Sequence, residues 1–357
     1  MRLRSLLLAI VAMPGIAASA FAQSDFSHDK LPGVYFSHGD WELACDNTGT
    51  CRAAGYQPGN SVPAVSVLLM RKAGPGQPVR AQVQIGELPD ETTQGKPTPV
   101  LQLAFYIDGK KMSVLTTGAA PVALPSKAVK ALLEALTRAA TIEFSAGRQR
   151  WQLSDKGSAA VMLKMDDFQG RIGTRGALVK PGSASEEQVL KAAPAPVVNA
   201  VRWAKAVPGK TLLAESQAEP LRRALRATLN DRDFCPELLD GDEEPLSVRR
   251  LDARRLLVAT RCNTGAYNIS DGYWVIDNTP GFGAVLVTTS GSEIDEPHIV
   301  ESHKGRGVGD CRTSATWTWE GERFIQTSMS STGMCRMVAA GGAWELPRIV
   351  SEVRGPR

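Results

Sequence analysis

The sequence lacks the short motifs that mark the common hydrolase, zinc and nucleotide sites. It contains no Gly-x-Ser-x-Gly elbow, no His-Glu-x-x-His pair and no complete Walker loop. No two cysteines have the Cys-x-x-Cys spacing, so neither a zinc knuckle nor a thioredoxin-like site is indicated. These absences leave no standard catalytic class to assign, and the sequence predicts neither a cofactor nor a bound metal.

The chain also lacks a strong excess of charge. It has 41 Lys and Arg against 37 Asp and Glu, and without Arg2 and Arg4 the balance is 39 against 37, a net charge of +2. This near-neutral balance gives no basis for a nucleic-acid-binding role. Long apolar runs of roughly 20 residues are missing as well, so we expect no transmembrane segment in the mature chain.

The N-terminus has the pattern of a cleavable signal peptide. Arg2 and Arg4 precede an apolar run over residues 6–12, and Ala20 and Ala22 place small residues three and one before a cut. We expect cleavage between Ala22 and Gln23, which makes residues 1–22 the signal peptide and the periplasm the address. The alternative, an uncleaved anchor, is disfavoured because the apolar run is too short to span a bilayer.

All six cysteines follow the expected cleavage site, and an even number in an exported protein indicates disulfides. Six cysteines allow 15 pairings in principle. The spacing favours the sequential one: Cys45 with Cys51 around the turn at 46–49, Cys235 with Cys262, and Cys311 with Cys335.

The first half of the mature chain reads mostly as strands: 41–45 and 79–85 alternate apolar and polar residues, and 65–70 is a short apolar run typical of a buried strand. We expect strands at 41–45, 51–56, 65–70, 79–85, 101–107, 112–116, 141–144 and 151–153. Asp108-Gly109 predicts a tight hairpin, because such a turn needs positive φ at both central residues. Helices are expected from Ser126 and over 158–165.

Residues 181–208 are rich in proline and small residues, which predicts an exposed linker. Beyond it we expect a helix over 215–230 and strands at 246–251, 256–260, 273–276, 284–288, 316–319 and 324–326. The predicted fold class is α+β: two domains rich in antiparallel β-strand, at 23–180 and 209–357, with a few covering helices and disulfide staples.

Two adjacent carboxylates, Asp166 and Asp167, come directly before a glycine turn that carries Arg171. These three are candidate ligand-binding residues, since paired carboxylates serve acid–base chemistry or calcium binding. Adjacent side chains rarely converge on one atom. The alternative is therefore a helix end with Arg171 pairing one of the two carboxylates.

The segment 293–303 is rich in imidazoles and carboxylates, with His298, Glu301 and His303 as candidate zinc ligands or catalytic groups. The His-x4-His spacing places the two histidines on opposite faces of a strand, or in poor alignment on a helix. A mobile polar loop is the alternative.

The run Gly305-Arg306-Gly307-Val308-Gly309-Asp310-Cys311 is rich in glycine, and Arg306 and Asp310 are candidate ligand-binding residues. With Arg312, Arg306 could present an anion site. A phosphate-binding loop needs a helix N-terminus behind it, whereas here a cysteine and a Trp-rich segment follow. A tight loop anchored by a disulfide is the alternative.

Four separated segments carry a resemblance to a known family. They are Trp41–Asn47 with Cys51–Tyr56, Met165–Gly173, Cys262 with Gly265–Asn268, and Gly305–Cys311. Together they resemble the domain of unknown function family 1176, a set of exported six-cysteine proteins of Gram-negative bacteria. The resemblance spans nearly the whole mature chain, with Arg312 as one departure from the family pattern. It implies a periplasmic address and a disulfide pattern, and it assigns no catalytic residue.

The leading hypothesis is a binding or interaction module of the cell envelope, with an envelope protein or a glycan as the partner. A second is an envelope enzyme of the hydrolase class, using Asp166 or Asp167, or His298 and His303. A third is a metal-dependent module built on the segment 293–303.

Overall fold

The structure, a computed structural model, describes residues 33–86, 100–118, 121–205, 212–230, 233–240, 245–279 and 281–356. All of these residues belong to one compact unit. They form mostly antiparallel sheets with a few helices and three disulfides, which confirms that part of the predicted fold class. The expected signal peptide and its cleavage site, Ala22 and Gln23, lie outside the described residues.

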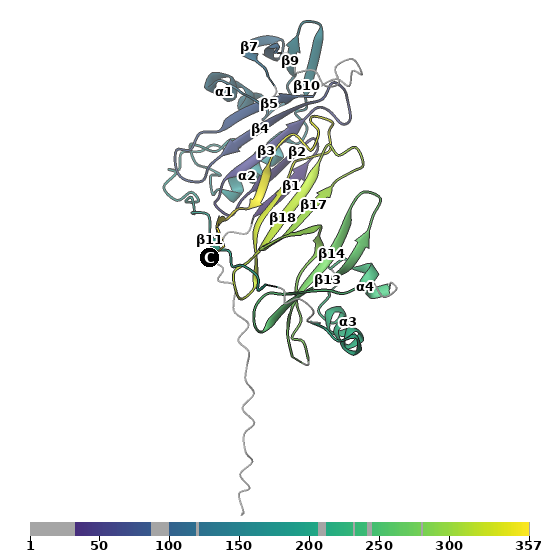
Figure 1. Cartoon of the computed structure of the whole chain (residues 1–357). Coiled ribbons are helices and arrows are strands. Elements are labelled where there is room, and N and C mark those ends of the chain that lie inside the picture. Colours follow the sequence, from purple (N-terminus) through teal and green to yellow (C-terminus); the bar gives the residue numbers. More distant parts are fainter. Residues whose placement is uncertain are drawn as a thin grey trace, which may run out of the picture. The chain divides into compact units, whose positions relative to one another are not determined.

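The first sheet has six antiparallel strands in the order β1-β2-β3-β4-β5-β8. They are β1 (Val34–His38), β2 (Trp41–Cys45), β3 (Cys51–Tyr56), β4 (Val65–Arg71), β5 (Arg80–Ile85) and β8 (Val122–Ala123). The purple and blue arrows of Figure 1 show the neighbours β1 to β5. Strands that follow one another along the chain are neighbours as far as β5, so short turns set the strand order.

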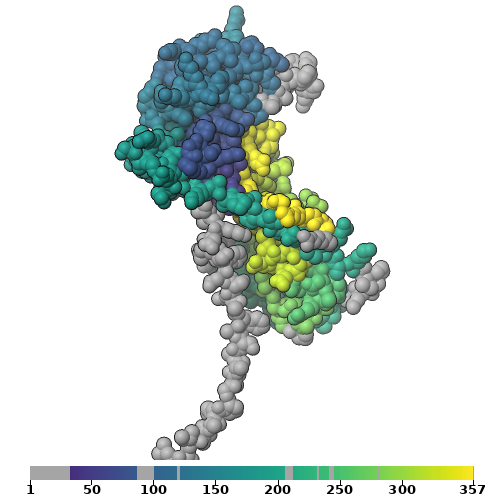
Figure 2. Space-filling model, turned by 90° about the vertical axis from the view of Figure 1, so that its left-hand side faces the viewer, coloured from purple at the N-terminus to yellow at the C-terminus, as the bar shows by residue number. Residues whose placement is uncertain are grey.

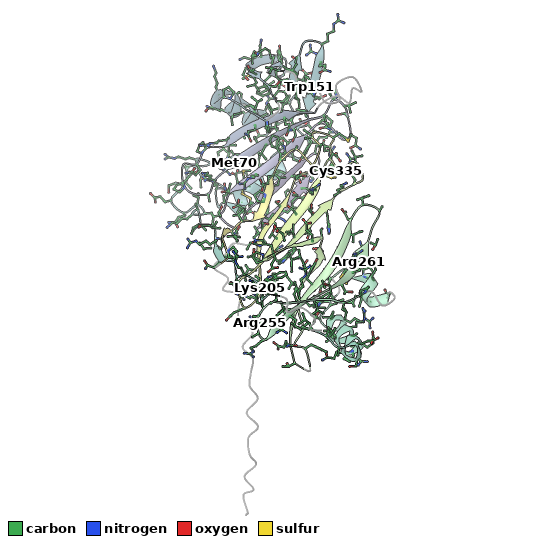
Figure 3. All side chains as sticks on the ribbon, viewed as in Figure 1. Met70, Trp151, Lys205, Arg255, Arg261 and Cys335 are labelled. Carbon is green, nitrogen blue, oxygen red and sulfur yellow. A yellow bond between two sulfur atoms is a disulfide. The ribbon has the colours of Figure 1, made fainter. Side chains whose placement is uncertain are left out.

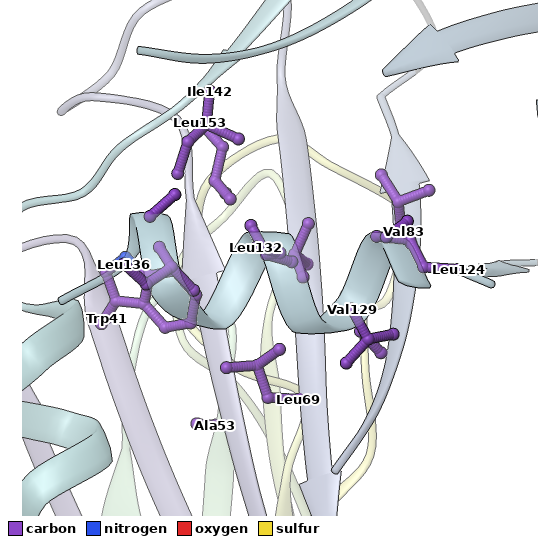
Figure 4. Packing of buried hydrophobic residues seen from close by; sticks show 14 of the residues in the cluster. Trp41, Ala53, Leu69, Val83, Leu124, Val129, Leu132, Leu136, Ile142 and Leu153 are labelled. Carbon is purple, nitrogen blue, oxygen red and sulfur yellow. The ribbon is translucent and has the colours of Figure 1, made fainter. Parts of the chain in front are cut away.

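A second sheet and two helices contribute to the core on one face of the first sheet. The second sheet has the order β10-β9-β6-β7, with β6 (Gln102–Ile107), β7 (Lys110–Thr116), β9 (Ile142–Ala146) and β10 (Gln149–Leu153). The helices are α1 (Ser126–Ala135) and α2 (Ser158–Phe168). Val129 and Leu132 of α1 share one buried core with Leu69 of β4 (Figure 4). Their spacing of three residues puts both on one side of the helix.

The opposite face of the first sheet packs against the chain's own C-terminal segment. Ala44 and Ala54 on this face, together with Ala64 just before β4, share a core with Trp344 and Leu346, and the larger Tyr56 and Leu68 belong to the same core. The space-filling view places yellow C-terminal residues directly beside the purple strands (Figure 2). Together with the core on the first face, this contact buries the central strands β2, β3 and β4 on both faces, whereas β1 and β5 keep exposed residues.

Glu42 of β2 is a buried carboxylate that holds this C-terminal segment. Its Oε1 accepts hydrogen bonds from the Tyr56 hydroxyl at 2.6 Å and from the backbone N–H of Met334 at 2.6 Å. Its Oε2 accepts one from the Tyr35 hydroxyl at 3.2 Å. Burial raises the pKa of Glu42, and the hydrogen bonds only partly offset that effect.

Two further sheets follow in the second half. The third sheet has the order β12-β13-β14-β15, with β12 (Ser247–Arg250), β13 (Arg255–Thr264), β14 (Ile269–Asp277) and β15 (Val285–Gly291). The fourth has the order β16-β17-β18-β19-β20, with β16 (Glu293–Asp295), β17 (His298–Lys304), β18 (Arg312–Trp319), β19 (Phe324–Ser331) and β20 (Leu346–Ile349). Leu257 and Tyr273 of the third sheet share a core with Ile299 and Trp319 of the fourth.

Short helices pack on the other face of the third sheet. They are a 3₁₀ helix (Glu215–Gln217), α3 (Ala218–Arg226) and α4 (Pro236–Asp240). Leu221 and Leu225 of α3 share a core with Trp274 of β14. The continuous helix expected over 215–230 is therefore wrong in its length, since the α-helical part ends at Arg226.

The segment after residue 181 is joined by backbone hydrogen bonds to both halves of the chain. Leu190 C=O accepts from Gly74 N–H at 2.8 Å, and Val201 N–H donates to Trp319 C=O at 2.9 Å. Farther along, β11 (Val197–Asn199) pairs in parallel with β21 (Glu352–Arg354). The division into two domains with a linker at 181–208 is thus not confirmed and stays a prediction. Residues 206–208 lie outside the described part.

The disulfides join Cys45 to Cys51, Cys235 to Cys262 and Cys311 to Cys335, which is the sequential pairing that the spacing favours. Cys45 and Cys51 lie directly opposite each other in the β2–β3 ladder. The expected Asp-Gly hairpin is present, with φ of 49° at Asp108 and 77° at Gly109. No helix within the described ranges is long and apolar enough to cross a membrane.

The packing of Gly55 against Trp41 gives a first test of the core. A Cβ on Gly55 would lie 2.2 Å from Cε2 of the fully buried Trp41 ring. We expect Gly55→Ala to lower the free energy of unfolding by about 1–3 kcal/mol, because overpacking forces the ring or the strand to move. Gly118→Ala is the matched control, since nothing lies within 4 Å of its Cβ position. Equal effects of the two variants in denaturant titrations would contradict this packing.

Glu42 gives a pH-dependent test. A carboxyl group whose pKa is raised by folding contributes stability below its unfolded pKa, and that contribution is lost as pH rises through the folded pKa. Glu42→Gln keeps the size and removes the titration. We therefore expect the stability of this variant relative to wild type to grow from about pH 4 to pH 7. Chemical denaturation at both pH values measures it, and a difference that does not change with pH would refute the assignment.

Candidate functional site

Asp166, at the end of α2, is completely buried and is satisfied within the chain. Its Oδ1 lies 2.5 Å from Nη2 of Arg71, and its Oδ2 accepts the backbone N–H groups of Leu178 at 2.6 Å and Val179 at 3.2 Å. Burial lowers the pKa of Arg71, and the Asp166 carboxylate acts in the opposite direction. This arrangement is a buried ion pair that ties β4 to the loop after α2.

Arg171 belongs to the same buried network through Gln169. The amide Oε1 of Gln169 accepts from Nε of Arg71 at 2.7 Å and from Nε of Arg171 at 3.2 Å. Arg171 also pairs with Glu186 and donates to the backbone carbonyl of Gly74. Burial raises the pKa of Glu186, but hydrogen bonding and the charge of Arg171 outweigh it and leave the pKa lowered. We call these five side chains, Arg71, Asp166, Gln169, Arg171 and Glu186, the arginine network.

Asp167 lies outside the arginine network. Its carboxylate is exposed and pairs with Lys164 at 2.7 Å on the surface of α2. The two adjacent carboxylates therefore do not converge on one atom. The expected pairing of Arg171 with one of them is not formed, because Arg71 occupies Asp166 and Arg171 reaches Glu186.

Arg306 and Asp310 meet each other in a second, separate place. Nε and Nη2 of Arg306 donate to the two carboxylate oxygens of Asp310 at 2.7 and 2.5 Å, and the backbone N–H of Met337 donates to Oδ2 at 2.7 Å. The hydrogen bond from Arg306 lowers the pKa of Asp310. Asp310 is buried while Arg306 is partly exposed, so the pair closes the glycine-rich loop.

Three loops come together around this pair, and we call residues 265–269, 305–311 and 335–341 the loop cluster. The disulfide between Cys311 and Cys335 (the latter labelled in Figure 3) and a 2.8 Å bond from Gly341 N–H to Gly309 C=O join the second loop to the third. The first loop is bound to the end of β17 by the Asn268 side chain. This amide donates to Lys304 C=O at 2.8 Å and accepts from Lys304 N–H at 2.9 Å.

Each loop exposes apolar side chains. The exposed fractions are 49% for Tyr267, 50% for Ile269, 67% for Val308 and 47% for Met337. Single exposed apolar residues are ordinary, but a group of them on fixed loops is typical of interaction surfaces. Met337 also has a φ of 59°, a left-handed backbone that non-glycine residues rarely adopt and that surrounding contacts must maintain.

The imidazoles of the segment 293–303 are separated by a strand. His298 and His303 lie in β17, five positions apart, and so on opposite faces. His298 Nδ1 lies 2.9 Å from the Thr318 hydroxyl, and burial lowers its pKa. The segment from 298 to 304 is thus a paired strand, and the mobile-loop alternative is wrong.

Glu301 and His303 share a face of β17 but do not form a catalytic relay with the nearby serine. Ser290 donates its hydroxyl directly to Glu301 at 2.6 Å, and His303 Nδ1 lies 4.0 Å from the same carboxylate. In a serine relay the imidazole stands between the hydroxyl and the acid. Among the described residues, the one group of three possible metal ligands is Asp310, Cys311 and Cys335, and both of its sulfurs are held in a disulfide.

Sequence reasoning found Arg306 and Asp310 but missed the residues that gather beside them. Tyr267, Val308 and Met337 come from segments up to 70 positions apart (267 to 337), and only folding brings their loops together. One local signal was present: Val308 stands between two glycines, where an apolar side chain has no neighbour to cover it.

Asp166→Asn tests whether Asp166 is structural. It leaves Arg71 as a buried cation without its counter-ion, so we expect a loss of about 3–5 kcal/mol in the free energy of unfolding. Asp167→Asn makes the same chemical change one residue away on an exposed side chain, and we expect a change within about 0.5 kcal/mol. Urea titration of both variants checks this. Wild-type stability of Asp166→Asn would contradict a structural role for this carboxylate.

Comparisons with known proteins agree with this description of a chain without an assigned chemistry. No solved structure matches the chain. An uncharacterized protein of Escherichia coli (strain K12), YpfG, is 25% identical over 330 residues, which cover 85% of this chain and 90% of that protein. The model of the family described as "protein of unknown function (DUF1176)" matches residues 35–351. Since that match covers most of the chain and the six cysteines are paired in the structure, the chain belongs to the DUF1176 family.

Proposed function

We propose that this protein is an exported binding module of the bacterial cell envelope and that it recognises a protein partner through the loop cluster. The observation that carries the proposal is the group of exposed apolar side chains on three mutually braced loops. Such a group costs solubility unless a partner covers it, so its persistence on fixed loops points to an interaction surface.

The bracing of the loops favours binding without rearrangement. Each loop is held by its own contact. The Cys311–Cys335 disulfide joins the second loop to the third, the Arg306–Asp310 pair closes the second, and the Asn268 side chain binds the first to the end of β17. A surface that is already ordered loses little conformational entropy when a partner docks. The arrangement therefore supports a preformed binding surface rather than a lid or a catalytic loop.

The residue types at the loop cluster support a protein over a glycan as the partner. Tyr267, Met337 and Arg306 belong to the residue types enriched at protein–protein interfaces, and Val308 adds an aliphatic contact. The carboxylates that acid–base chemistry would need are engaged elsewhere, Asp310 with Arg306 and Asp166 with Arg71. The enzyme hypothesis gains no support from these contacts.

The periplasmic address rests on two features. The sequence begins with a charged, then apolar, then small-residue pattern read by signal peptidase, and the structure pairs all six cysteines. Disulfides persist in oxidising compartments such as the bacterial periplasm, where an exported envelope protein would meet its partner.

Site-specific crosslinking tests the proposal. A photo-crosslinking amino acid in place of Tyr267, in tagged full-length protein exported by its own cells, is expected to trap one partner reproducibly. Val308→Asp in the same background should reduce that product at least about tenfold, because it places a charge in the contact.

Val114 supplies the control: it is as exposed as Tyr267, at 48% against 49%, and of the same residue type as Val308, but it lies on β7 of the second sheet. Neither Val114→Asp nor a crosslinker at position 114 should reproduce the effects at the loop cluster. Trapping of the same protein at position 114, undiminished trapping with Val308→Asp, or no product at position 267 would each contradict the proposal.

A further inference from the structure

The loops that contact the arginine network are also joined to one another by backbone hydrogen bonds. Backbone hydrogen bonds join the stretch after β4 to the two stretches that follow α2: Gly74 N–H to Leu190 C=O at 2.8 Å, Gly173 N–H to Lys180 C=O at 3.0 Å and Arg175 N–H to Ala184 C=O at 3.2 Å. Figure 2 shows these teal loops directly beside the purple and blue strands. The buried Arg71 and Arg171 also hold these loops in place. Arg71 donates to Gly176 C=O, and Arg171 donates to Gly74 C=O.

These loops carry four exposed cations. Lys72, Arg175, Lys180 and Lys191 are all exposed, and none of their side chains has a salt-bridge partner within the described residues. We call these four side chains the basic face. Across residues 72–78 and 170–192 the acidic residues are Glu186 and Glu187 alone.

The buried charges below do not cancel the basic face. Arg71 is balanced by Asp166 and Arg171 by Glu186, so the arginine network is neutral as a unit. That leaves Glu187 as the one acid in these loops outside the network, against four outward cations. The basic face therefore holds a net positive charge, while the mature chain as a whole is close to neutral.

An apolar side chain accompanies these cations. Ile172 stands next to the buried Arg171 and is itself 46% exposed. Cations together with a projecting apolar side chain are the combination that binds the interfacial region of an anionic bilayer, because charge attracts headgroups and apolar area enters the acyl boundary. A site for a soluble polyanion needs the charge but not the isoleucine.

We propose that the basic face binds the anionic headgroups of a phospholipid bilayer, with Ile172 entering the interface. The arginine network then holds the loops in the arrangement that binds the membrane. This is the role we assign to Asp166, Gln169 and Arg171, the buried polar residues of the segment 165–173. This surface shares no residue with the loop cluster, so the protein can hold a membrane and a partner through different surfaces.

Vesicle co-sedimentation of the full-length mature protein tests the proposal. We expect binding to vesicles containing anionic phosphatidylglycerol in phosphatidylcholine, little binding to phosphatidylcholine alone, and release at about 0.5 M NaCl. Each basic side chain near a membrane surface contributes about fivefold in affinity. The combined variant K72A/R175A/K180A/K191A should therefore bind at least about 100-fold more weakly, and Ile172→Ser should weaken binding without changing its salt dependence.

A control of equal charge separates a specific face from net charge. Lys110, Lys111, Arg148 and Arg150 are exposed on β7, at the β9–β10 turn and on β10, and their combined replacement by alanine should leave vesicle binding unchanged. Circular dichroism verifies that both fourfold variants are folded. Equal losses in the two variants, equal binding to neutral vesicles, or competition by heparin with no effect of Ile172→Ser would each overturn the membrane assignment. Crosslinking at position 267 is scored separately and tests the loop cluster alone.

Discussion

The docking of the C-terminal segment onto the first sheet is the constraint on which much of the remaining structure depends. Ala44, Ala54 and Ala64 share one buried core with Trp344 and Leu346, and Trp344 follows Ala44 by 300 positions (44 to 344). Glu42 then accepts the Met334 N–H, and Arg336 donates to Asp40 at 2.8 Å. Because Cys335 and Met337 lie within this same stretch, the docking also determines where the third loop of the loop cluster stands.

Buried charges in this protein support loops rather than perform chemistry. The arginine network contains two arginines and two carboxylates, and each of these charges has its partner inside the chain. Buried ion pairs contribute little net stability compared with apolar packing, but the removal of one partner is costly. Such a network therefore fixes one loop arrangement against alternatives. Asp166 and Arg171, which the sequence offers as candidate site residues, thus hold loops whose exposed residues carry no motif.

The two proposed surfaces use the same device with different chemistry. In the loop cluster, the buried Asp310 forms an ion pair with Arg306, and the three loops expose Tyr267, Val308 and Met337. Near the basic face, Asp166 pairs with Arg71 and Glu186 pairs with Arg171. The loops that these pairs hold expose the four cations and Ile172. In both places an internal ion pair gives an irregular loop a fixed shape, which a flexible loop of the same composition would lack.

The sequence by itself determined the local structure and the covalent pattern. Alternation, short apolar runs and turn residues identified β2 to β7, Asp108-Gly109 identified its hairpin, and spacing indicated the disulfide pairing, because these depend on neighbours along the chain. It missed β17, because polar residues on both faces of this strand resemble a loop and its pairing with β18 leaves no local pattern in the sequence. Only the tertiary structure decided that Asp166 pairs with Arg71, that the segment 334–346 covers one face of the first sheet, and that Tyr267 and Met337 lie on neighbouring loops. Those contacts join residues 70 to 300 positions apart (267 to 337, 44 to 344), and no local pattern records which distant side chain will satisfy a buried charge or cover a small-residue face.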